Sequence, residues 1–148
     1  MSGVGSTEPP NSGGAGSAGA GAGTVEGIHR VFAAFNGGDP RALFEVIAED
    51  AVWRVGGSAP IARTYTGRHD VFDLFRETRR QTDGTYRSTL RWALADEENA
   101  VAVYRACGRR NGRELDIDQA LLITLRDGQW SEIVAVPTDP AAFEAFWS

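Results

Sequence analysis

Apolar side chains recur every three to four positions through the first half of the chain, the spacing of one face of an α-helix. The first series runs from Ile28 to Phe35 and stops at the Gly37-Gly38 pair. Asp39 followed by Pro40 is a typical start for a second, short helix. The pattern therefore predicts helices over 25–36, 40–50 and 68–80, with two short strands at 51–55 and 63–66.

After residue 84 the apolar period changes to two, as in strands that have two different faces. Tyr86, Leu90, Trp92 and Leu94 share one predicted face of the first strand. Two dipeptides, Asn-Gly at 111–112 and Asp-Gly at 127–128, are hairpin signals, because these residues tolerate the positive φ of tight turns. We expect four long antiparallel strands, at 86–95, 100–109, 113–125 and 129–136, and then a C-terminal helix that starts at Asp139-Pro140.

This order of elements predicts one α+β domain over residues 25–148. A cone-shaped, curved antiparallel sheet wraps over three N-terminal helices, and a short C-terminal helix completes the domain. A strongly twisted sheet of this kind encloses a conical cavity. Residues 1–24 are rich in Gly, Ala and Ser and have no apolar period, so we expect them to form a flexible tail.

Composition and charge exclude several classes of function. The chain has 20 acidic and 15 basic side chains, for a net charge of -5, so no nucleic-acid partner is expected. All basic residues other than His29 and His69 are arginine, which excludes Schiff-base lysine chemistry and a Walker-type loop. No metal-ligand spacing is present, and we expect no metal and no other cofactor. Without a long apolar run or a signal peptide, we expect a soluble, cytoplasmic protein with no membrane partner.

Five short stretches, in this order, carry a family pattern: Val31-Phe-Ala-Ala-Phe-Asn-Gly-Gly-Asp-Pro, Ala48-Glu-Asp-Ala-Val-Trp, Thr64-Tyr-Thr-Gly-Arg, Gly112-Arg-Glu-Leu-Asp and Arg126-Asp-Gly-Gln-Trp. Together they resemble the SnoaL-like polyketide cyclases, within the superfamily of ketosteroid isomerase and nuclear transport factor two. The resemblance covers about residues 25–148. It implies a cone-shaped barrel, a largely apolar pocket between the first helices and the concave sheet face, and a homodimer. Family members include isomerases, cyclases, epoxide hydrolases and proteins without chemistry.

The resemblance also indicates which isomerase groups this chain lacks. In those enzymes a carboxylate moves a proton at the carbon beside a carbonyl, while hydroxyl or carboxyl donors hold the enolate oxygen. The tyrosine donor of the first helix falls on Val31, and the base after the second helix falls on Val55. The second donor, on the strand after the Asn-Gly hairpin, falls on Leu121. Classical ketosteroid isomerase chemistry is therefore not expected.

Three polar residues are the catalytic candidates: Tyr104, Gln119 and Asp118. Asp116 and Asp118 share one strand face, and Gln119 lies on the other. The favoured register points Gln119 inward and both aspartates outward, whereas a bulge would turn Asp118 inward as an acid, base or donor. Small inward neighbours leave room for a ligand beside the Tyr104 phenol, although a core tyrosine bonded to a backbone carbonyl is the alternative.

The expected pocket walls are aromatic and apolar. Trp53 is placed to sandwich a flat substrate, or else belongs to the core, and Tyr65 would line the mouth. Glycines in the loop 56–60 would let this loop hinge over an entrance. The predicted substrate-binding residues are Trp53, Tyr65, Phe35, Val31, Leu121 and Val55.

These features predict a small cyclase or isomerase of natural-product biosynthesis that acts on a polyketide-like substrate without a cofactor. The dry pocket would hold the chain in a reactive fold while Tyr104 or Gln119 polarises a carbonyl. Two alternatives stay open. One is a noncatalytic module that binds an apolar metabolite, or another protein through its open sheet face. The other is an epoxide hydrolase in which an inward Asp118 activates a bound water.

Overall fold

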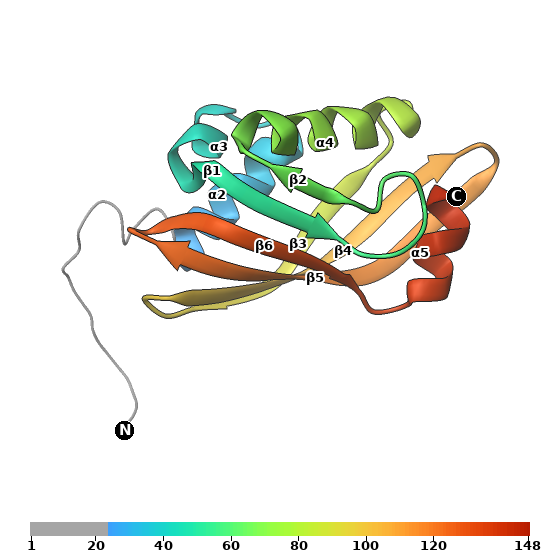
Figure 1. The fold of residues 1–148 in the computed structure, drawn as a ribbon. Helices are drawn as coiled ribbons and strands as arrows, with labels where there is room; N and C mark the ends of the chain where they lie inside the picture. The colour runs from blue at the N-terminus through green and yellow to red at the C-terminus, as the bar shows by residue number, and fades with distance from the viewer. Residues whose placement is uncertain (1–23) are drawn as a thin grey trace, which may run out of the picture.

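The structure, a computed structural model, describes residues 24–148, so the predicted tail other than Thr24 lies outside the described residues. Helices α2, α3 and α4 cover one face of a curved sheet, and α5 packs near the hairpin end of β4 and β5 (Figure 1). This confirms the predicted α+β class. The elements are α2 (Val25–Phe35), α3 (Arg41–Val46), β1 (Ile47–Val55), β2 (Thr64–Thr66), α4 (Arg68–Gln81), β3 (Arg87–Ala95), β4 (Asn99–Arg110), β5 (Arg113–Arg126), β6 (Gln129–Pro137) and α5 (Pro140–Trp147).

Local sequence signals set the ends of several helices. Gly37 follows α2 with a φ of 107°, a conformation that favours glycine. The Asp39 side chain accepts a hydrogen bond from the Arg41 backbone N–H at the start of α3. The Asp139 side chain does the same for the Ala142 N–H in α5. These carboxylates satisfy N–H groups that have no partner within a helix, as expected for capping residues.

The sheet has six strands in the order β2-β1-β6-β5-β4-β3 and is curved but not closed. β3, β4, β5 and β6 pair antiparallel in sequence through the predicted tight turns. β1, however, runs parallel to β6, so the prediction of a wholly antiparallel sheet was wrong in this pair. A long stretch that includes α4 separates these two strands, and a connection of that length allows either direction.

β1 begins at Ile47, within the segment predicted to continue the second helix. The Arg68 guanidinium, at the start of α4, donates to the carbonyl oxygens of Phe44 and Ile47 at 2.8–3.0 Å. It thus satisfies carbonyl groups at the end of α3 that a longer helix would have used itself. This contact comes from a distant part of the chain, and the local apolar pattern cannot reveal it.

A bulge in β3 corrects the predicted strand face. Leu90 and Trp92 pair with consecutive residues of β4, so Arg91 is an extra residue in the ladder. The bulge reverses the alternation: Tyr86 and Leu90 pack against the core, whereas Trp92 and Leu94 are 51% and 64% exposed on the outer face. The prediction that these four side chains share one face was therefore wrong.

The hydrophobic core fills the space between the helices and the inner, concave face of the sheet. Trp130 and Ile133 of β6, Phe146 of α5 and Ile28 of α2 are almost completely buried there. No helix in residues 24–148 is both long and apolar enough to cross a membrane.

Candidate functional site

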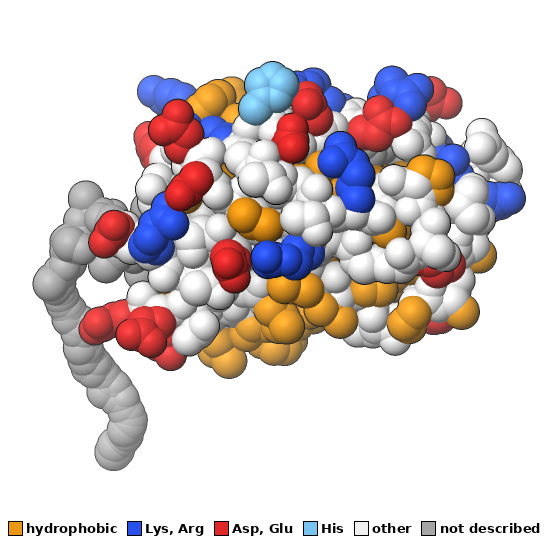
Figure 2. Space-filling view, viewed as in Figure 1, with side chains coloured by type: hydrophobic (Ala, Val, Ile, Leu, Met, Phe, Trp, Pro, Cys, Tyr) orange, Lys and Arg blue, Asp and Glu red, His pale blue; other side chains and the backbone are white. Residues whose placement is uncertain are grey.

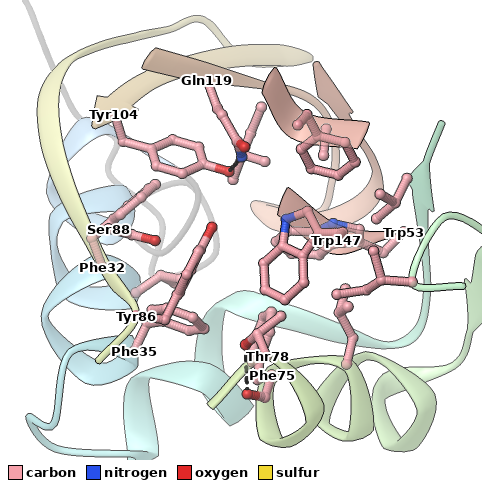
Figure 3. A pocket seen from close by; sticks show the side chains of 17 residues that line it. Phe32, Phe35, Trp53, Phe75, Thr78, Tyr86, Ser88, Tyr104, Gln119 and Trp147 are labelled. Carbon is pink, nitrogen blue, oxygen red and sulfur yellow. Dashed lines mark hydrogen bonds between the residues drawn. The ribbon is translucent and has the colours of Figure 1, made fainter. Parts of the chain in front are cut away.

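A cavity remains open within this core, between the helices and the inner sheet face (Figure 3). Its volume is about 80 Å³, measured as the space open to the centre of a water molecule. The walls are mostly aromatic and aliphatic, and no charged side chain of residues 24–148 lines them. Such a space suits an uncharged, largely apolar ligand. The lining residues are Val31, Phe32, Phe35, Trp53, Val55, Ile61, Leu74, Phe75, Thr78, Tyr86, Ser88, Tyr104, Gln119, Leu121, Ala135, Phe143 and Trp147.

Most residues predicted for the site lie on this wall, although their functional roles remain predictions. Alternate residues of β4 and β5 point inward, while the first helix and β1 supply the opposite walls. Tyr65 and Asp118 are the two predicted residues that do not line the cavity. The predicted residues on the wall are Val31, Phe35, Trp53, Val55, Tyr104, Gln119 and Leu121.

Tyr104 and Gln119 form a hydrogen-bonded pair on the cavity wall (Figure 3). They are directly opposite each other on β4 and β5, and the Gln119 Nε2 donates to the Tyr104 hydroxyl oxygen at 2.7 Å. Both side chains are buried, with 6% and 3% exposed. Burial, and then the neighbouring Tyr86, raise the pKa of Tyr104 well above its ordinary value. The phenol therefore keeps its proton at neutral pH and can donate it in a hydrogen bond.

The hydroxyls of Tyr86 and Ser88 face the same space, a feature that the sequence interpretation missed (Figure 3). Burial raises the pKa of Tyr86 to about 12, and a hydrogen bond with the Ser88 side chain opposes this shift. Tyr86 carries the same signal as Tyr104, a tyrosine in the inward set of its strand. The sequence nevertheless indicated Tyr86 only as part of an apolar strand face, and its hydroxyl was not among the predicted site groups. The buried phenol of Tyr104 and the partly buried phenol of Tyr86 therefore offer neutral O–H donors to one cavity.

Aromatic rings make the walls stiff as well as apolar. The Phe32 and Tyr104 ring centroids are 5.1 Å apart, and Trp53 meets Phe75 edge to face at 5.3 Å. Phe35 packs against Phe75 at the same kind of angle. Such ring contacts fix side-chain orientation and hold the shape of the cavity.

Tyr65 supports a loop instead of lining the cavity. Its hydroxyl donates to the Ile61 carbonyl oxygen at 2.7 Å, and the Arg63 guanidinium lies 3.9 Å from the centre of its ring. Ile61 itself lines the cavity. Tyr65 therefore acts on the cavity only through the position of this loop.

Asp118 lies on the outer face of β5, away from the cavity. Its carboxylate is 3.2 Å from Arg105 and 3.7 Å from Arg91. The pairing of β4 with β5 has no register break, so the bulge that would turn Asp118 inward is absent. An epoxide hydrolase that uses an inward Asp118 is therefore contradicted by this geometry.

The loop between β1 and β2, predicted as a gate, is tied to α5. The Ser58 backbone N–H and hydroxyl donate to the Glu144 carboxylate at 3.0 Å and 2.9 Å. Gly57 has a φ of 119°, and an added Cβ there would overlap the Glu144 carboxylate. We call these two hydrogen bonds the Ser58–Glu144 latch. Both elements that it joins contribute to the cavity wall, through Ile61 and through Phe143 and Trp147.

Two clusters of polar residues outside the cavity have structural explanations. His69, Asp70 and Asp73 come close together at the exposed start of α4, where Asp73 is paired with Arg76 and His69. At the hairpin after β4, the guanidinium of Arg110 donates to backbone carbonyls at the end of α5. These contacts stabilise a helix and a hairpin.

No carboxylate or histidine of the described residues lines the cavity, so its wall offers no obvious base for removing a proton from carbon. What it does offer is an apolar surround, a shape held by packed rings and neutral hydrogen-bond groups at one place. This combination can hold a flexible molecule in one conformation and stabilise a developing negative charge on an oxygen.

Comparison with known proteins shows where this chain belongs. Residues 28–133 match the SnoaL-like domain. An uncharacterized protein of Mycobacterium tuberculosis is 34% identical over 122 residues, covering 82% of this chain and 93% of the relative. The chain therefore belongs to the SnoaL-like domain family, and the predicted resemblance is confirmed.

Solved structures share the fold. Bal32a, from a soil-derived mobile gene cassette, superposes with a TM-score of 0.79 at 28% identity, over 83% of this chain and 95% of that one. A protein from Jannaschia Sp. CCS1, classed provisionally as a SnoaL-like polyketide cyclase, has a TM-score of 0.67 at 16% identity, over 84% and 91%. At that identity the second likeness concerns the fold alone.

Proposed function

We propose that this chain is a cofactor-independent cyclase or isomerase that promotes ring closure in an uncharged, polyketide-like molecule. One observation carries the proposal: an apolar cavity whose wall holds a buried amide–phenol pair, Gln119 and Tyr104. The match of residues 28–133 to the SnoaL-like domain supports the proposal at the level of the family.

Ring closure fits a cavity without a base because the enol form of a polyketone already has a nucleophilic carbon. When this carbon attacks a second carbonyl in the same molecule, the enol C–O becomes a carbonyl and the attacked carbonyl becomes a hydroxyl. The enol proton ends on that new hydroxyl oxygen, so no co-reactant is consumed. Confinement raises the frequency of the reactive conformation, and the Tyr104 O–H stabilises charge on the attacked oxygen.

The test is to incubate the full chain with linear polyketone and polyene precursors and to follow ring closure by liquid chromatography and mass spectrometry. Tyr104→Phe removes the donor but keeps the ring, and should lower kcat about 100-fold. Ser131→Ala is the control, because that hydroxyl bonds to the Thr124 carbonyl and neither residue lines the cavity. No acceleration over buffer across the whole precursor set would contradict the proposal.

A second candidate is a noncatalytic module that stores or carries an apolar metabolite. The lack of a carboxylate or histidine among the described lining residues favours it. The same incubations separate the two functions: a ligand that binds and is recovered unchanged after long incubation supports the binding module.

We also propose that the outer sheet face pairs with a second copy of this chain. Trp92, Leu94, Leu122, Val134 and Val136 are 36–64% exposed there, and we call this group the outer patch. Hydrophobic side chains gather along the lower side of the molecule in Figure 2, below the sheet. Large contiguous apolar patches on a protein surface typically mark interaction sites.

Charge on the outer face is compatible with a symmetric pair. Arg105, on the same face, bonds to both Asp116 and Asp118, so opposite charges are already matched within one copy. In a two-fold dimer each patch meets its own copy, and an apolar centre avoids opposing like charges there.

A further inference from the structure

The Gln119 amide oxygen is the most unusual polar atom of the cavity. Its side chain is 3% exposed, and Oε1 has no hydrogen-bond partner in the described structure, while Nε2 donates to Tyr104. A buried acceptor without a partner is costly, so native structures rarely keep one without a reason. Gln119 lines the cavity, and its unpaired oxygen, which is itself shielded from solvent, lies within that wall.

The neighbouring Tyr104 hydroxyl, in contrast, needs a hydrogen-bond acceptor. Its oxygen accepts from Gln119 Nε2, and its own proton is then left for another acceptor. One wall of the cavity thus presents an acceptor and a donor that are held in place by a 2.7 Å hydrogen bond.

No compensating charge is available to a charged ligand. The lining has no charged side chain in residues 24–148, and burial raises the pKa of both Tyr86 and Tyr104, so these phenols stay neutral. An anion would lose its hydration without gaining a positive partner. The ligand that fits this wall is therefore neutral.

We infer that the cavity selects an uncharged ligand with an O–H or N–H donor beside an oxygen acceptor, the donor bonding to Gln119 Oε1 and the acceptor to the Tyr104 hydroxyl. An enol or hydroxyl next to a carbonyl has this arrangement. The inference rests on the proposed function in that it assigns a ligand class to the same cavity. Gln119 then acts as the specificity-determining residue, because a ligand without a donor leaves its oxygen unpaired.

Three two-ring probes that differ in one substituent test this selection. 2-Naphthol carries a donor, 2-methoxynaphthalene has the same ring with the donor methylated, and 2-naphthoate is an anion at pH 7. Isothermal titration calorimetry with the full chain should show 2-naphthol binding about ten-fold tighter than the methyl ether, with 2-naphthoate weakest. Phenol, anisole and benzoate repeat the comparison on a single ring, so that size alone does not decide the result.

Substitution of Gln119 assigns the effect to one atom. Gln119→Met keeps the length of the side chain but removes the acceptor, so 2-naphthol and its methyl ether should bind equally. Gln119→Leu is a second, shorter variant with the same expected loss. Gln129→Met is the matched control, since Gln129 bonds to the Glu45 carbonyl outside the cavity, and the ten-fold preference should persist.

The outcomes separate this inference from the proposed function. Equal binding of naphthol and methyl ether to the unaltered chain, or tighter binding of the ether, overturns the donor requirement. Ring closure of precursors could still occur in that case. Absence of binding by both probe series also overturns the inference, whereas failure of the proposed function is measured separately, by unchanged precursors.

Discussion

The inner and outer faces of the sheet are built from the same strands but present different side chains for binding. Along β5, Ile117, Gln119 and Leu121 are buried on the inner face, and the last two line the cavity, while Asp118 and Leu122 point outward. The inner face is covered by helices. The polar groups that it presents to the cavity are one amide and a few hydroxyls. The outer face combines arginine–carboxylate pairs with exposed apolar side chains, and no helix of residues 24–148 covers it.

This difference indicates two kinds of partner. A small cavity with few polar groups suits a small molecule, whereas an open apolar patch with ion pairs beside it suits another protein surface. The alternation of β-strands lets one set of strands serve both purposes. Substitutions at neighbouring positions should therefore have very different effects, depending on the face that they alter.

The largest contrast is expected between two consecutive residues of β6. Ile133 is 0% exposed on the inner face, and Val134 is 36% exposed on the outer face. Ile133→Ala should lower the free energy of unfolding by about 3 kcal/mol, because it leaves a void in a packed core. Val134→Ala should cost about 0.5 kcal/mol or less. Urea denaturation at low protein concentration, where a dimer would dissociate, measures both; similar losses would contradict the two-face description.

Alkaline pH tests the contribution of one tyrosine of the inner face, Tyr86. Burial raises the pKa of Tyr86 to about 12, so folding favours the protonated phenol. This contribution is complete below the unfolded value near 10 and is lost as pH rises through about 12, on the order of 2 kcal/mol. Thermal unfolding between pH 9 and 12 should show the decline, and Tyr86→Phe should make it shallower. An unchanged slope in that variant would show that Tyr86 does not cause the decline.

Much of this architecture could be predicted from the sequence because the signals are local. The tight turns at residues 111–112 and 127–128, the inward position of Gln119 and the outward position of Asp118 all follow from period and turn chemistry. The exposed Trp92 could not be predicted, since the bulge at Arg91 depends on pairing with β4.

For the cavity, too, local sequence signals predict only part of the structure. Tyr104 could be singled out from its small inward neighbours, but the unpaired Gln119 oxygen depends on which groups meet across two strands. The end of α3 was likewise misplaced, because Arg68 binds its last carbonyls from a distant position. Contacts between segments far apart in sequence decide these details.

The outer patch can be disrupted without altering the cavity. Leu122→Arg places a charge at an exposed position of the patch, and in a two-fold dimer two such charges would face each other. We expect sedimentation velocity to change from dimer to monomer at micromolar concentration, with binding of 2-naphthol unchanged. Thr124→Arg, further along the same face of β5, is the matched control and should leave the dimer intact. A monomeric unaltered chain would refute the proposed pairing.

The smallest effect is expected at the Ser58–Glu144 latch, which ties the loop between β1 and β2 to α5. Its hydrogen bonds lie at the exposed surface, so Glu144→Ala should cost only about 0.5–1 kcal/mol of stability. The loop would nevertheless open more often, and stopped-flow fluorescence should show 2-naphthol associating and dissociating a few-fold faster with little change in Kd. Hydrogen exchange should rise at residues 56–60 and stay constant in β5. Glu97→Ala, in the exposed turn before β4, provides the matched control; equal acceleration by both variants would mean that the latch does not govern access to the cavity.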